Sequence, residues 1–389
     1  MSAQRRICFL SASHPAEDKR VFHKEARSLA GAGFGVVHLC PGEERKSYVK
    51  DSVRIETYPR RAGKLSRLVG LLDLYRVARA IDADAYHCNE PDSWVVGVAL
   101  RATRRRRVVF DCHEHYPGTV TRWLPPGTRV VGRFVTRVVL QLLGLVTHLI
   151  VLAKPSVSDD FSLSRRRQLL VLNTTSLAYV TSKVPASASE RDTFTFVHFG
   201  VFRRERGSEQ LLGALHLLWK WDVDVRVRLI GEFTDGSRDS FFAKASDDGI
   251  VHLIEDFEWM PFDEAFPLVA SSDAGLVLFQ GGVENNVRGL PHKMFDYMIA
   301  GLPVIGPSFA PDIAAIIRQT DAGVLLDTGD VHALATAMRQ LVEDSAETRR
   351  LGVNARRAVV EMYNWEAEAA KLIDAYEQLL PVRPSASRR

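Results

Sequence analysis

The stretch GLPHKMFDYMIAGLPVIG, residues 289–306, indicates the fold because it holds one short helix followed by one short strand. Pro291 suits the first turn of a helix, since its fixed φ is already helical. Gly301 suits the helix end, where a left-handed residue closes the last turn. The following LPVIG has the β-branched character of a buried parallel strand. We therefore expect this stretch to be one helix–strand unit of an α/β sheet.

The short helix is predicted to have two unlike faces. At helical spacing, one face carries polar residues and the other apolar residues: Lys293, Asp296, Tyr297 and Ala300 against Phe295, Met298 and Ile299. A charged pair near the start of a helix that packs on a core requires a partner. Water, another side chain and a ligand are the three alternatives.

Strand-like runs alternate with helical patterns along the whole chain. One series extends to residue 178, and a second begins at residue 193. Between them, YVTSKVPASASERD at 179–192 is small, polar and unpatterned, which is typical of a linker. Two such series predict an α/β protein with two doubly wound, parallel-sheet, Rossmann-like domains. We expect domains over 1–178 and 193–362 that face each other across a ligand-binding cleft, with a final helix and tail over 363–389 that pack back toward the N-terminal domain.

Composition bounds the class of protein. A chain of 389 residues exceeds what one hydrophobic core usually supports. With 46% hydrophobic and 25% charged residues, it fits neither a disordered nor a fibrous class. The N-terminus enters a strand without an apolar signal segment. The longest apolar stretch, residues 134–153, is interrupted by Arg137, Gln141 and His148, which predicts a buried helix running into a strand and not a membrane span.

The cysteines point to a reducing compartment. All four lie in or beside apolar runs and show no C-x-x-C spacing: Cys8, Cys40, Cys88 and Cys112. They are expected to be structural thiols, and the protein is expected to be cytoplasmic.

Charge is distributed unevenly along the chain. Residues 1–170 hold 29 Lys and Arg against 16 Asp and Glu, a balance of +13, and the remainder holds 22 against 31, a balance of −9. The first half therefore suits an anionic partner: phospholipid headgroups at the inner face of a membrane, a lipid-phosphate acceptor or nucleic acid. Solvated basic loops such as RATRRRR at 101–107 are an equal alternative. We expect no nucleic acid, because zinc-ligand spacing, RNA-binding motifs and interleaved aromatics are missing from the sequence.

The glycines of GAGFG, residues 31–35, do not form a dinucleotide fingerprint. That motif requires a further glycine at position 36, which is Val36, and here the glycines end a helix. A nicotinamide site is therefore not expected.

One loop in the second half suits a diphosphate. In FVHFGVFRRERGSEQLLGAL, residues 196–215, a strand ends at Gly200, and Arg203, Arg204 and Arg206 precede the next helix. Guanidinium groups beside a helix N-terminus are matched to diphosphate oxygens. Simple solvation of an exposed loop is the alternative.

Two loops in the first half carry further candidates. In RVVFDCHEHYP, residues 107–117, a buried strand runs out into a loop with Asp111, His113 and Glu114, and polar residues at such positions commonly line a site. In SASHPAEDKR, residues 11–20, the first strand is followed by three more polar residues: His14, Asp18 and Arg20. These last three suit either a substrate contact or a helix cap with surface charges.

Over nearly its whole length the sequence resembles retaining glycosyltransferases of the GT-B fold, close to family 4. The stretches that carry the resemblance are HPAEDKRVFHKEARSLAGAGFGVV, VVFDCHEHYP, HKMFDYMIAGLPVIG and DAGVLLDTGDVHALATAMRQLVED. The resemblance implies a UDP- or GDP-sugar donor bound mainly by the C-terminal domain and an acceptor bound mainly by the N-terminal one.

The resemblance also implies roles for single residues. Asp296 would contact the ribose, Arg206 the diphosphate and His113 the donor sugar. The other candidates are Asp111 and Glu114 for catalysis, Gly200, Arg203, Arg204, Arg288 and Lys293 for the donor, and His14, Asp18 and Arg20 for the acceptor. The family often has glutamate where this chain has Asp296, and a second glutamate where it has Arg288. That departure leaves the identity of the sugar undecided.

The expected activity is transfer of a sugar to a hydroxyl with retention, without metal or other cofactor. Front-face attack assisted by the leaving phosphate would place most of the catalysis in electrostatic stabilisation. The acceptor is expected to be a glycan, a lipid-linked molecule or a small molecule. A sugar-nucleotide 2-epimerase of the same architecture and a non-catalytic nucleotide-sugar-binding subunit are the alternatives.

Overall fold

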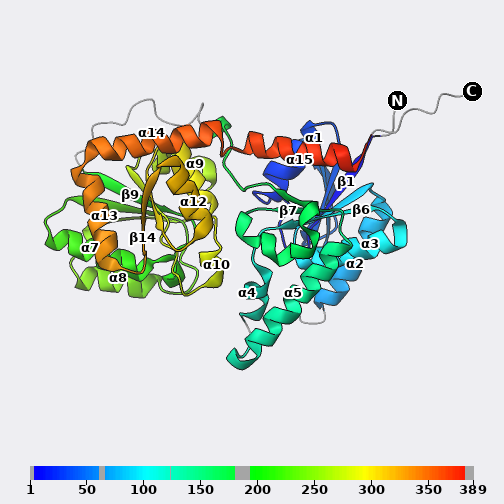
Figure 1. Cartoon of the computed structure of the whole chain (residues 1–389), viewed down its shortest axis with the longest axis horizontal. Coiled ribbons are helices and arrows are strands. Elements are labelled where there is room, and N and C mark those ends of the chain that lie inside the picture. Colours follow the sequence, from blue (N-terminus) through cyan, green and yellow to red (C-terminus); the bar gives the residue numbers. More distant parts are fainter. Residues whose placement is uncertain (1–3, 61–65, 123, 180–192, 382–389) are drawn as a thin grey trace, which may run out of the picture. The chain divides into compact units, whose positions relative to one another are not determined.

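The computed structural model describes residues 4–60, 66–122, 124–179 and 193–381, and the chain forms two compact units (Figure 1). Unit 1 comprises Met1–Asn173 and Trp365–Arg389, and unit 2 comprises Thr174–Asn364. From residue 180 onward, the linker predicted over 179–192 lies outside the described residues.

Unit 1 alternates strands and helices. Its elements are β1 (Arg6–Leu10), η1 (Val21–Ala26), α1 (Arg27–Gly31), β2 (Gly35–Gly42), β3 (Ser47–Lys50), β4 (Val53–Pro59), α2 (Ser66–Ile81), β5 (Ala85–Cys88), α3 (Pro91–Arg104), β6 (Arg107–Cys112), α4 (Tyr116–Thr121), η2 (Pro126–Thr128), α5 (Arg129–Leu145), β7 (Leu149–Leu152), η3 (Pro155–Arg167), β8 (Gln168–Leu170) and α15 (Trp365–Leu379).

Unit 2 repeats the alternation. Its elements are β9 (Phe194–Phe199), η4 (Arg204–Arg206), α7 (Ser208–Lys220), β10 (Val225–Ile230), α8 (Arg238–Asp247), η5 (Val251–Leu253), β11 (Ile254–Phe257), α9 (Phe262–Ala270), β12 (Ala274–Leu276), α10 (Glu284–Val287), α11 (His292–Ile299), β13 (Val304–Pro307), α12 (Pro311–Thr320), β14 (Gly323–Leu326), α13 (Val331–Glu343) and α14 (Ser345–Glu361).

Both sheets are doubly wound, as the sequence predicts. The strand order is β3-β4-β2-β1-β5-β6-β7-β8 in unit 1 and β11-β10-β9-β12-β13-β14 in unit 2, and all pairs are parallel except β3–β4. The strand order therefore reverses direction between β1 and β5 in one sheet and between β9 and β12 in the other. Ligands of such sheets bind beyond the carboxyl ends of the strands at this switch point.

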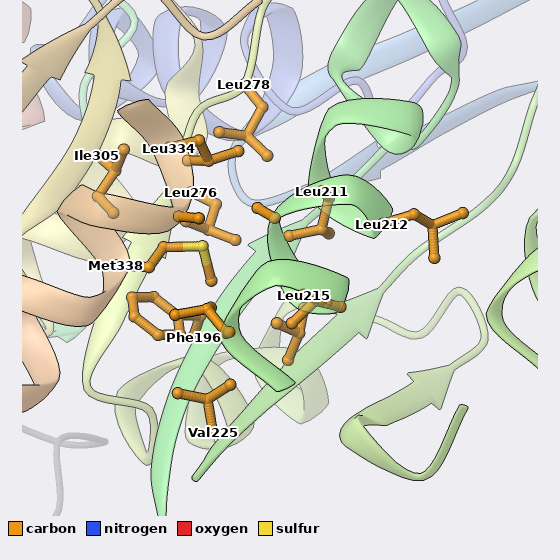
Figure 2. Close-up of a cluster of buried hydrophobic side chains, with 14 of the residues drawn as sticks. Phe196, Leu211, Leu212, Leu215, Val225, Leu276, Leu278, Ile305, Leu334 and Met338 are labelled. Carbon is orange, nitrogen blue, oxygen red and sulfur yellow. The ribbon is translucent and has the colours of Figure 1, made fainter. Parts of the chain in front are cut away.

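Each sheet is covered by helices on both faces, which explains why its central strands are mostly apolar. In β9 of unit 2, Phe196 packs toward α7 and α13 (Figure 2), and the next residue, Val197, packs toward α9 and α11. In β1 of unit 1, Cys8 and Phe9 are divided in the same way. The alternation fixes the register of each strand, because a slip of one residue would exchange the two faces.

The C-terminal helix α15 packs on unit 1. Leu372 and Tyr376 belong to the same core as β1 and α1. The Tyr376 hydroxyl lies 2.8 Å from Nδ1 of buried His87, and Arg5 donates to the carbonyl of Leu380 at 2.9 Å. These contacts anchor the chain's last helix to its first strands.

Three local expectations were wrong. The antiparallel edge strand β3 is not predicted by the sequence, because SYVK is mostly exposed and lacks an apolar run. The helical pattern of the sequence predicts a first helix from Asp18 to Ala32, but this helix begins with a π-turn at Val21, and the Asp18 carboxylate accepts the backbone N–H of Val21.

The third concerns α5, which was expected to be buried. It exposes most of its apolar side chains to solvent, Phe134 with 67% of its surface. None of the helices within the described ranges combines the length and apolar character that crossing a membrane requires. All four cysteines are buried and free, in line with their prediction as structural thiols.

Candidate active site

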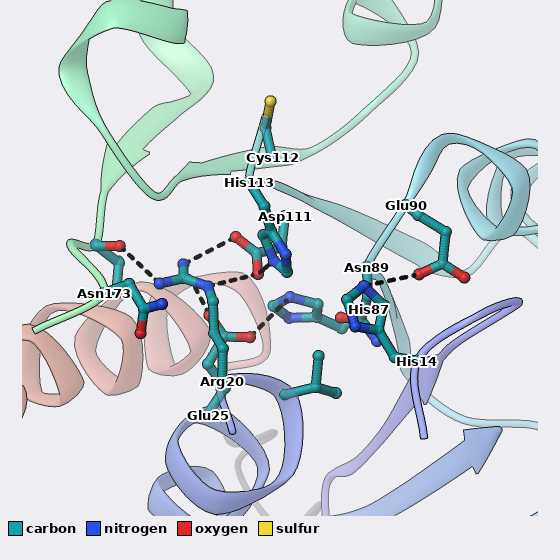
Figure 3. A network of polar contacts seen from close by, with 12 residues as sticks. His14, Arg20, Glu25, His87, Asn89, Glu90, Asp111, Cys112, His113 and Asn173 are labelled. Carbon is teal, nitrogen blue, oxygen red and sulfur yellow. Dashed lines mark hydrogen bonds and ion pairs between the residues drawn. The ribbon is translucent and has the colours of Figure 1, made fainter. Parts of the chain in front are cut away.

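In unit 1, polar side chains converge from the loops that follow β1, β5 and β6 (Figure 3). His14 Nδ1 lies 3.1 Å from the carboxylate of Asp18, and its Nε2 lies 3.5 Å from that of Glu90. The rings of His14 and His113 meet edge to face with centroids 5.5 Å apart. The structure thus brings predicted residues from two separate motifs together at the switch point of the sheet.

Behind His113 lies a buried ion-pair network. His113 Nε2 is hydrogen-bonded to the carboxylate of Asp111, which also accepts two hydrogen bonds from Arg20, each 2.9 Å long. Burial would raise the pKa of Asp111, but Arg20 and His113 outweigh it and hold that pKa well below its usual range. Asp111 is therefore a fixed carboxylate that orients the His113 ring.

Arg20, one of the candidates for the acceptor, is buried in unit 1. Its side chain is 5% exposed, and it also donates to the Val171 carbonyl at 3.1 Å and pairs with Glu25 at 2.9 Å. The guanidinium nitrogens that make these three contacts all point into the interior of unit 1. The structure therefore assigns Arg20 to the support of Asp111, because its guanidinium is committed to buried partners.

The same network bears on metal binding. Within the described residues, one group of three ligand-type side chains lies close enough to share an ion: Glu25, His87 and Asp111. Arg20 already bridges the two carboxylates of this group. Burial raises the pKa of Glu25 well above its usual range and lowers that of His87 to about 3, so burial disfavours the charged form of both groups. The guanidinium of Arg20 therefore already supplies the positive charge that a metal ion would bring to these two carboxylates.

Glu90 was not predicted from the sequence. It precedes α3 and accepts backbone N–H groups of the loop after β1, from Ser13 at 3.1 Å and from Ala12. Burial raises the pKa of Glu90 to about 7. The signal that identified Asp111 and His113, polar residues where a strand runs out, is also present in the sequence CNEP at 88–91.

The remaining two candidates of unit 1 differ in placement. Burial would raise the pKa of Asp18, but hydrogen bonds from His14 and from backbone N–H groups lower it below its usual value. Asp18 is therefore a charged cap that also holds His14. Glu114 is exposed and accepts a hydrogen bond from Thr119 at 2.9 Å, at α4 instead of at the His14–His113 pair.

In unit 2, the loop after β9 has a constrained backbone. Gly200 and Gly207 have φ values of +93° and +85°. A Cβ at position 207 would lie 2.5 Å from Cβ of Leu278 and 2.6 Å from its carbonyl oxygen, so only glycine fits there. Asn286 of α10, which sequence reasoning missed, donates to the Glu205 carbonyl at 2.7 Å. The loop is thereby held against the ends of β12 and α10.

The three predicted arginines lie on this loop, before α7. The guanidinium of Arg206 lies 4.5 Å from the ring centroid of Phe279, and Arg204 pairs with Glu209 at 3.1 Å. Arg203 pairs with Glu205 at 3.5 Å. The loop therefore presents guanidinium groups at the carboxyl end of β9, beside the switch point of the second sheet.

Helix α11 adds a buried amine to this end of the sheet. Lys293 Nζ lies 2.8 Å from Nε2 of His198, a residue of β9 that sequence reasoning did not select. Burial, and then the charge of Arg206, lower the pKa of Lys293 well below its usual value. Burial, and then Lys293, do the same for His198. A bound anion would favour the charged form of Lys293, because a nearby opposite charge stabilises the protonated amine.

Asp296 lies one turn further along α11, where its side chain is only 1% exposed. It accepts a hydrogen bond from His292 at 2.8 Å, and the ring of His292 is 13% exposed. The hydroxyl of Tyr297 accepts the backbone N–H of Phe199 at 2.8 Å, which ties α11 to the end of β9. Arg288 follows α10 and lies 3.9 Å from Glu284, so an ion pair occupies the place of the family's second glutamate.

Comparison with known proteins agrees with this arrangement. Residues 193–344 match the family Glycosyl transferases group 1, and residues 19–156 match Glycosyltransferase Family 4. The structure of sucrose-phosphate synthase from Thermosynechococcus elongatus superposes with a TM-score of 0.73 at 17% identity, over 97% of this chain and 99% of that one. HepE from Anabaena, solved in complex with UDP, superposes with a TM-score of 0.71 at 15% identity, over 96% and 100%.

Curated relatives match over shorter stretches. An MMP alpha-(1->4)-mannosyltransferase from Mycolicibacterium hassiacum is 25% identical over 176 residues, which are 45% of this chain and 40% of that protein. The lipopolysaccharide core biosynthesis glycosyltransferase LpsE from Rhizobium meliloti is 24% identical over 246 residues, 61% of this chain and 65% of that protein. The matched stretches thus span between about two fifths and two thirds of these relatives.

Two doubly wound parallel-sheet units of this kind, superposing on such structures along nearly the whole chain, define the GT-B class of fold. Family matches lie in both units. The chain is therefore similar to Glycosyltransferase Family 4 in unit 1 and to the Glycosyl transferases group 1 in unit 2, and it has the GT-B fold.

Proposed function

We propose that this protein transfers a sugar from a UDP- or GDP-sugar to a hydroxyl acceptor with retention of configuration. The observation that carries the proposal is that family matches fall in both units, over residues 19–156 and 193–344. Structural neighbours support the donor class, because HepE has been solved with UDP, with UDP and glucose, and with UDP-glucose.

The donor nucleotide would bind at the carboxyl end of the sheet in unit 2. Arg206, with Arg203 and Arg204 on the same loop, would neutralise the diphosphate, and that anion would favour the charged form of Lys293. Asp296 would accept a hydrogen bond from the ribose. Because Asp296 is so well buried, we propose that His292 shares this contact and that Asp296 fixes the orientation of its ring.

In unit 1, the donor sugar and the acceptor would meet the residues of the switch point. His113, held by Asp111, would lie against the sugar. His14 and Asp18 would contact the acceptor beside it, since the two histidine rings are in contact. Arg20 would act by holding Asp111, and Glu114 would lie at the rim with Thr119.

In the transfer step, the bond between the anomeric carbon and the diphosphate oxygen breaks and a bond from that carbon to the acceptor oxygen forms on the same face. The acceptor proton passes to the departing phosphate. The growing negative charge on the diphosphate is stabilised by Arg206 and Lys293, which supplies most of the catalysis. No metal takes part in this proposal. The acceptor would be a glycan, a lipid-linked molecule or a small molecule, as in envelope polysaccharide, glycolipid or secondary-metabolite synthesis.

Calorimetric titration of UDP and of GDP tests the donor site. Arg206→Ala should weaken binding of the preferred nucleotide by roughly 10- to 150-fold, which corresponds to the loss of a charge-assisted contact of about 1.5–3 kcal/mol. The matched control is Arg226→Ala, an exposed arginine on β10 of the same unit, which should bind like the parent. Unchanged affinity in the Arg206 variant would exclude the diphosphate assignment.

Product analysis tests the reaction. The enzyme should consume a nucleotide sugar and release the nucleotide only when an acceptor hydroxyl is present. Conversion of the donor to an isomeric nucleotide sugar without any acceptor would instead identify a 2-epimerase. Binding of a nucleotide sugar without any turnover, with or without an acceptor, would favour the non-catalytic alternative. A ligand at about 100 times its dissociation constant stabilises the folded state by ~2.7 kcal/mol, which a thermal-shift screen detects.

A further inference from the structure

Helix α5 and the residue after it carry a continuous apolar surface. Nine large apolar side chains there are exposed: Val130, Val131, Phe134, Val135, Val138, Val139, Leu142, Leu145 and Val146. With about 100° of rotation per residue, these nine positions occupy roughly half of the helix circumference. The opposite side, with Leu140 and Gly144, packs into unit 1. We call these nine residues the apolar face of α5.

Such a face is unusual for a protein surface. Single exposed apolar residues are common and need no explanation, but a contiguous patch marks a site of interaction. In Figure 1, α5 and the neighbouring α4 extend from unit 1 beyond its sheet, with the N-terminal end of α5 farthest out. Within the described residues, therefore, this end of α5 is a projecting helix with an apolar side.

The charges around the apolar face select the kind of partner. Residues 115–158 contain no Asp or Glu, and they contain five basic residues: Arg122, Arg129, Arg133, Arg137 and Lys154. By helical spacing, Arg137 lies at one edge of the apolar face, beside Val130, and Arg133 lies one turn earlier, further from that edge. A second copy of the same face would bring arginines against arginines. An anionic lipid surface satisfies both the apolar side chains and the positive edge.

A basic pocket lies at the C-terminal end of the helix. Its volume is about 380 Å³, and it is lined by Leu145 and by residues Ser162–Arg167. Arg167 Nη1 donates to the carbonyl of Thr147 at 2.8 Å, which caps the end of α5, and Arg165 pairs with exposed Asp159 at 3.0 Å. Guanidinium and hydroxyl groups around a concave surface suit a phosphate group. The pocket continues the apolar face because Leu145 belongs to both.

From these observations we propose that the apolar face of α5 and this pocket form one docking surface for a bilayer that contains anionic phospholipid. The helix would lie in the interface with its apolar face among the acyl chains and its arginines among the headgroups, as interfacial amphipathic helices do. Lipid phosphates would enter the pocket. This inference goes beyond the proposed sugar transfer and does not depend on it.

Sedimentation with vesicles tests the proposal on the full chain. The protein should bind vesicles of equimolar phosphatidylcholine and phosphatidylglycerol and not vesicles of phosphatidylcholine alone. The triple change Phe134→Gln, Val138→Gln and Leu142→Gln should weaken binding by about tenfold or more, because it removes three apolar side chains from the buried face. These positions are exposed, so the fold should be kept.

A matched control makes the same exchange elsewhere. Val251→Gln, Val353→Gln and Val360→Gln replace three exposed valines of unit 2 and should leave vesicle binding unchanged. Arg137→Gln should weaken binding by roughly fivefold, since one arginine near an anionic surface contributes about 1 kcal/mol. The same change should also reduce the dependence of binding on salt.

An environment-sensitive fluorophore distinguishes insertion from adsorption. Because the four native cysteines are buried, Val138→Cys provides a selective site for labelling. Its emission should shift to the blue with anionic vesicles, and a label at Val353→Cys should show no shift. A pair of labels that respond alike would overturn the proposed placement of α5.

Two further results would overturn the proposal. Equal binding to neutral and anionic vesicles would rule out recognition of anionic lipid. A concentration-dependent dimer in vesicle-free solution, abolished by the triple change in α5, would show that a second copy covers this face. Neither result bears on nucleotide binding by unit 2, so failure here leaves the proposed function to be judged by its own assays.

Discussion

Removal of Arg20 should destabilise unit 1 far more than removal of an ordinary surface arginine. The Arg20 side chain is 5% exposed and pairs with the fully buried carboxylates of Asp111 and Glu25, each at 2.9 Å. Arg20→Met would keep the side-chain length and leave Asp111 without its main counter-charge. Because solvent screens little at this depth, breaking such a pair should cost about 3–5 kcal/mol.

The control for this change lies seven residues along the chain. Arg27 pairs with Asp51 at 3.4 Å, and the two side chains are 47% and 41% exposed. Arg27→Met should cost less than about 1 kcal/mol, as exposed pairs do. Calorimetric melting would show the contrast, since 3–5 kcal/mol corresponds to a fall in Tm of roughly 6–20 °C for a unit of this size.

A double variant separates loss of the pair from loss of packing. Arg20→Met combined with Asp111→Asn removes both charges, so it should recover part of the stability lost by Arg20→Met alone. The reasoning is refuted if Arg20→Met melts within the range of Arg27→Met. In that case the carboxylates would be satisfied by water or by protons, and the network could not orient His113 as described.

Two further changes follow from the same reasoning. Burial raises the folded-state pKa of Glu90 from its usual 4.5 to about 7, so the unfolded chain releases this proton first as the pH rises. The free energy of unfolding should therefore fall by up to about 1.4 kcal/mol per pH unit between these two values. Glu90→Gln should flatten that slope when stability is measured by urea titration at a series of pH values. Gly207→Ala should cost more stability and nucleotide affinity than Gly249→Ala. Both glycines have positive φ, but a Cβ at position 207 would lie within 2.6 Å of Leu278, whereas a Cβ at position 249 would have no described atom within 4 Å. Equal losses in the two variants would contradict this prediction.

The positions of many strands could be predicted from the sequence because a parallel strand covered on both faces is a continuous apolar run. RVVFDC and LPVIG are such runs, and they form β6 and the start of β13 as expected. β3 could not be found in this way, since an exposed antiparallel edge needs no apolar run. For α5, the apolar composition predicted a helix correctly. It could not show whether the apolar face is buried in the protein, because the same residues suit a buried helix and an interfacial one.

The location of the site could be predicted, but its pairings could not. Polar residues where strands run out identified His14, Asp111 and His113, and parallel strands place all such ends at one edge of the sheet. The bond between Arg20 and Asp111 joins residues 91 positions apart, and no local pattern encodes it. His198 was missed for a related reason: within an apolar strand a histidine is usually structural, and only the fold shows Lys293 beside it.

The candidate residues of unit 1 and those of unit 2 differ in their electrostatic surroundings. In unit 1, the buried cation Arg20 pairs with Glu25 and Asp111. In unit 2, Lys293 is influenced by Arg206 more strongly than by Asp296, and burial and Arg206 together disfavour its charge. Arrival of a diphosphate would relieve that imbalance, whereas a neutral sugar or acceptor would not. The charge distribution therefore favours a nucleotide at unit 2 and uncharged hydroxyl groups at unit 1, which is the division of labour that sugar transfer from a nucleotide donor requires.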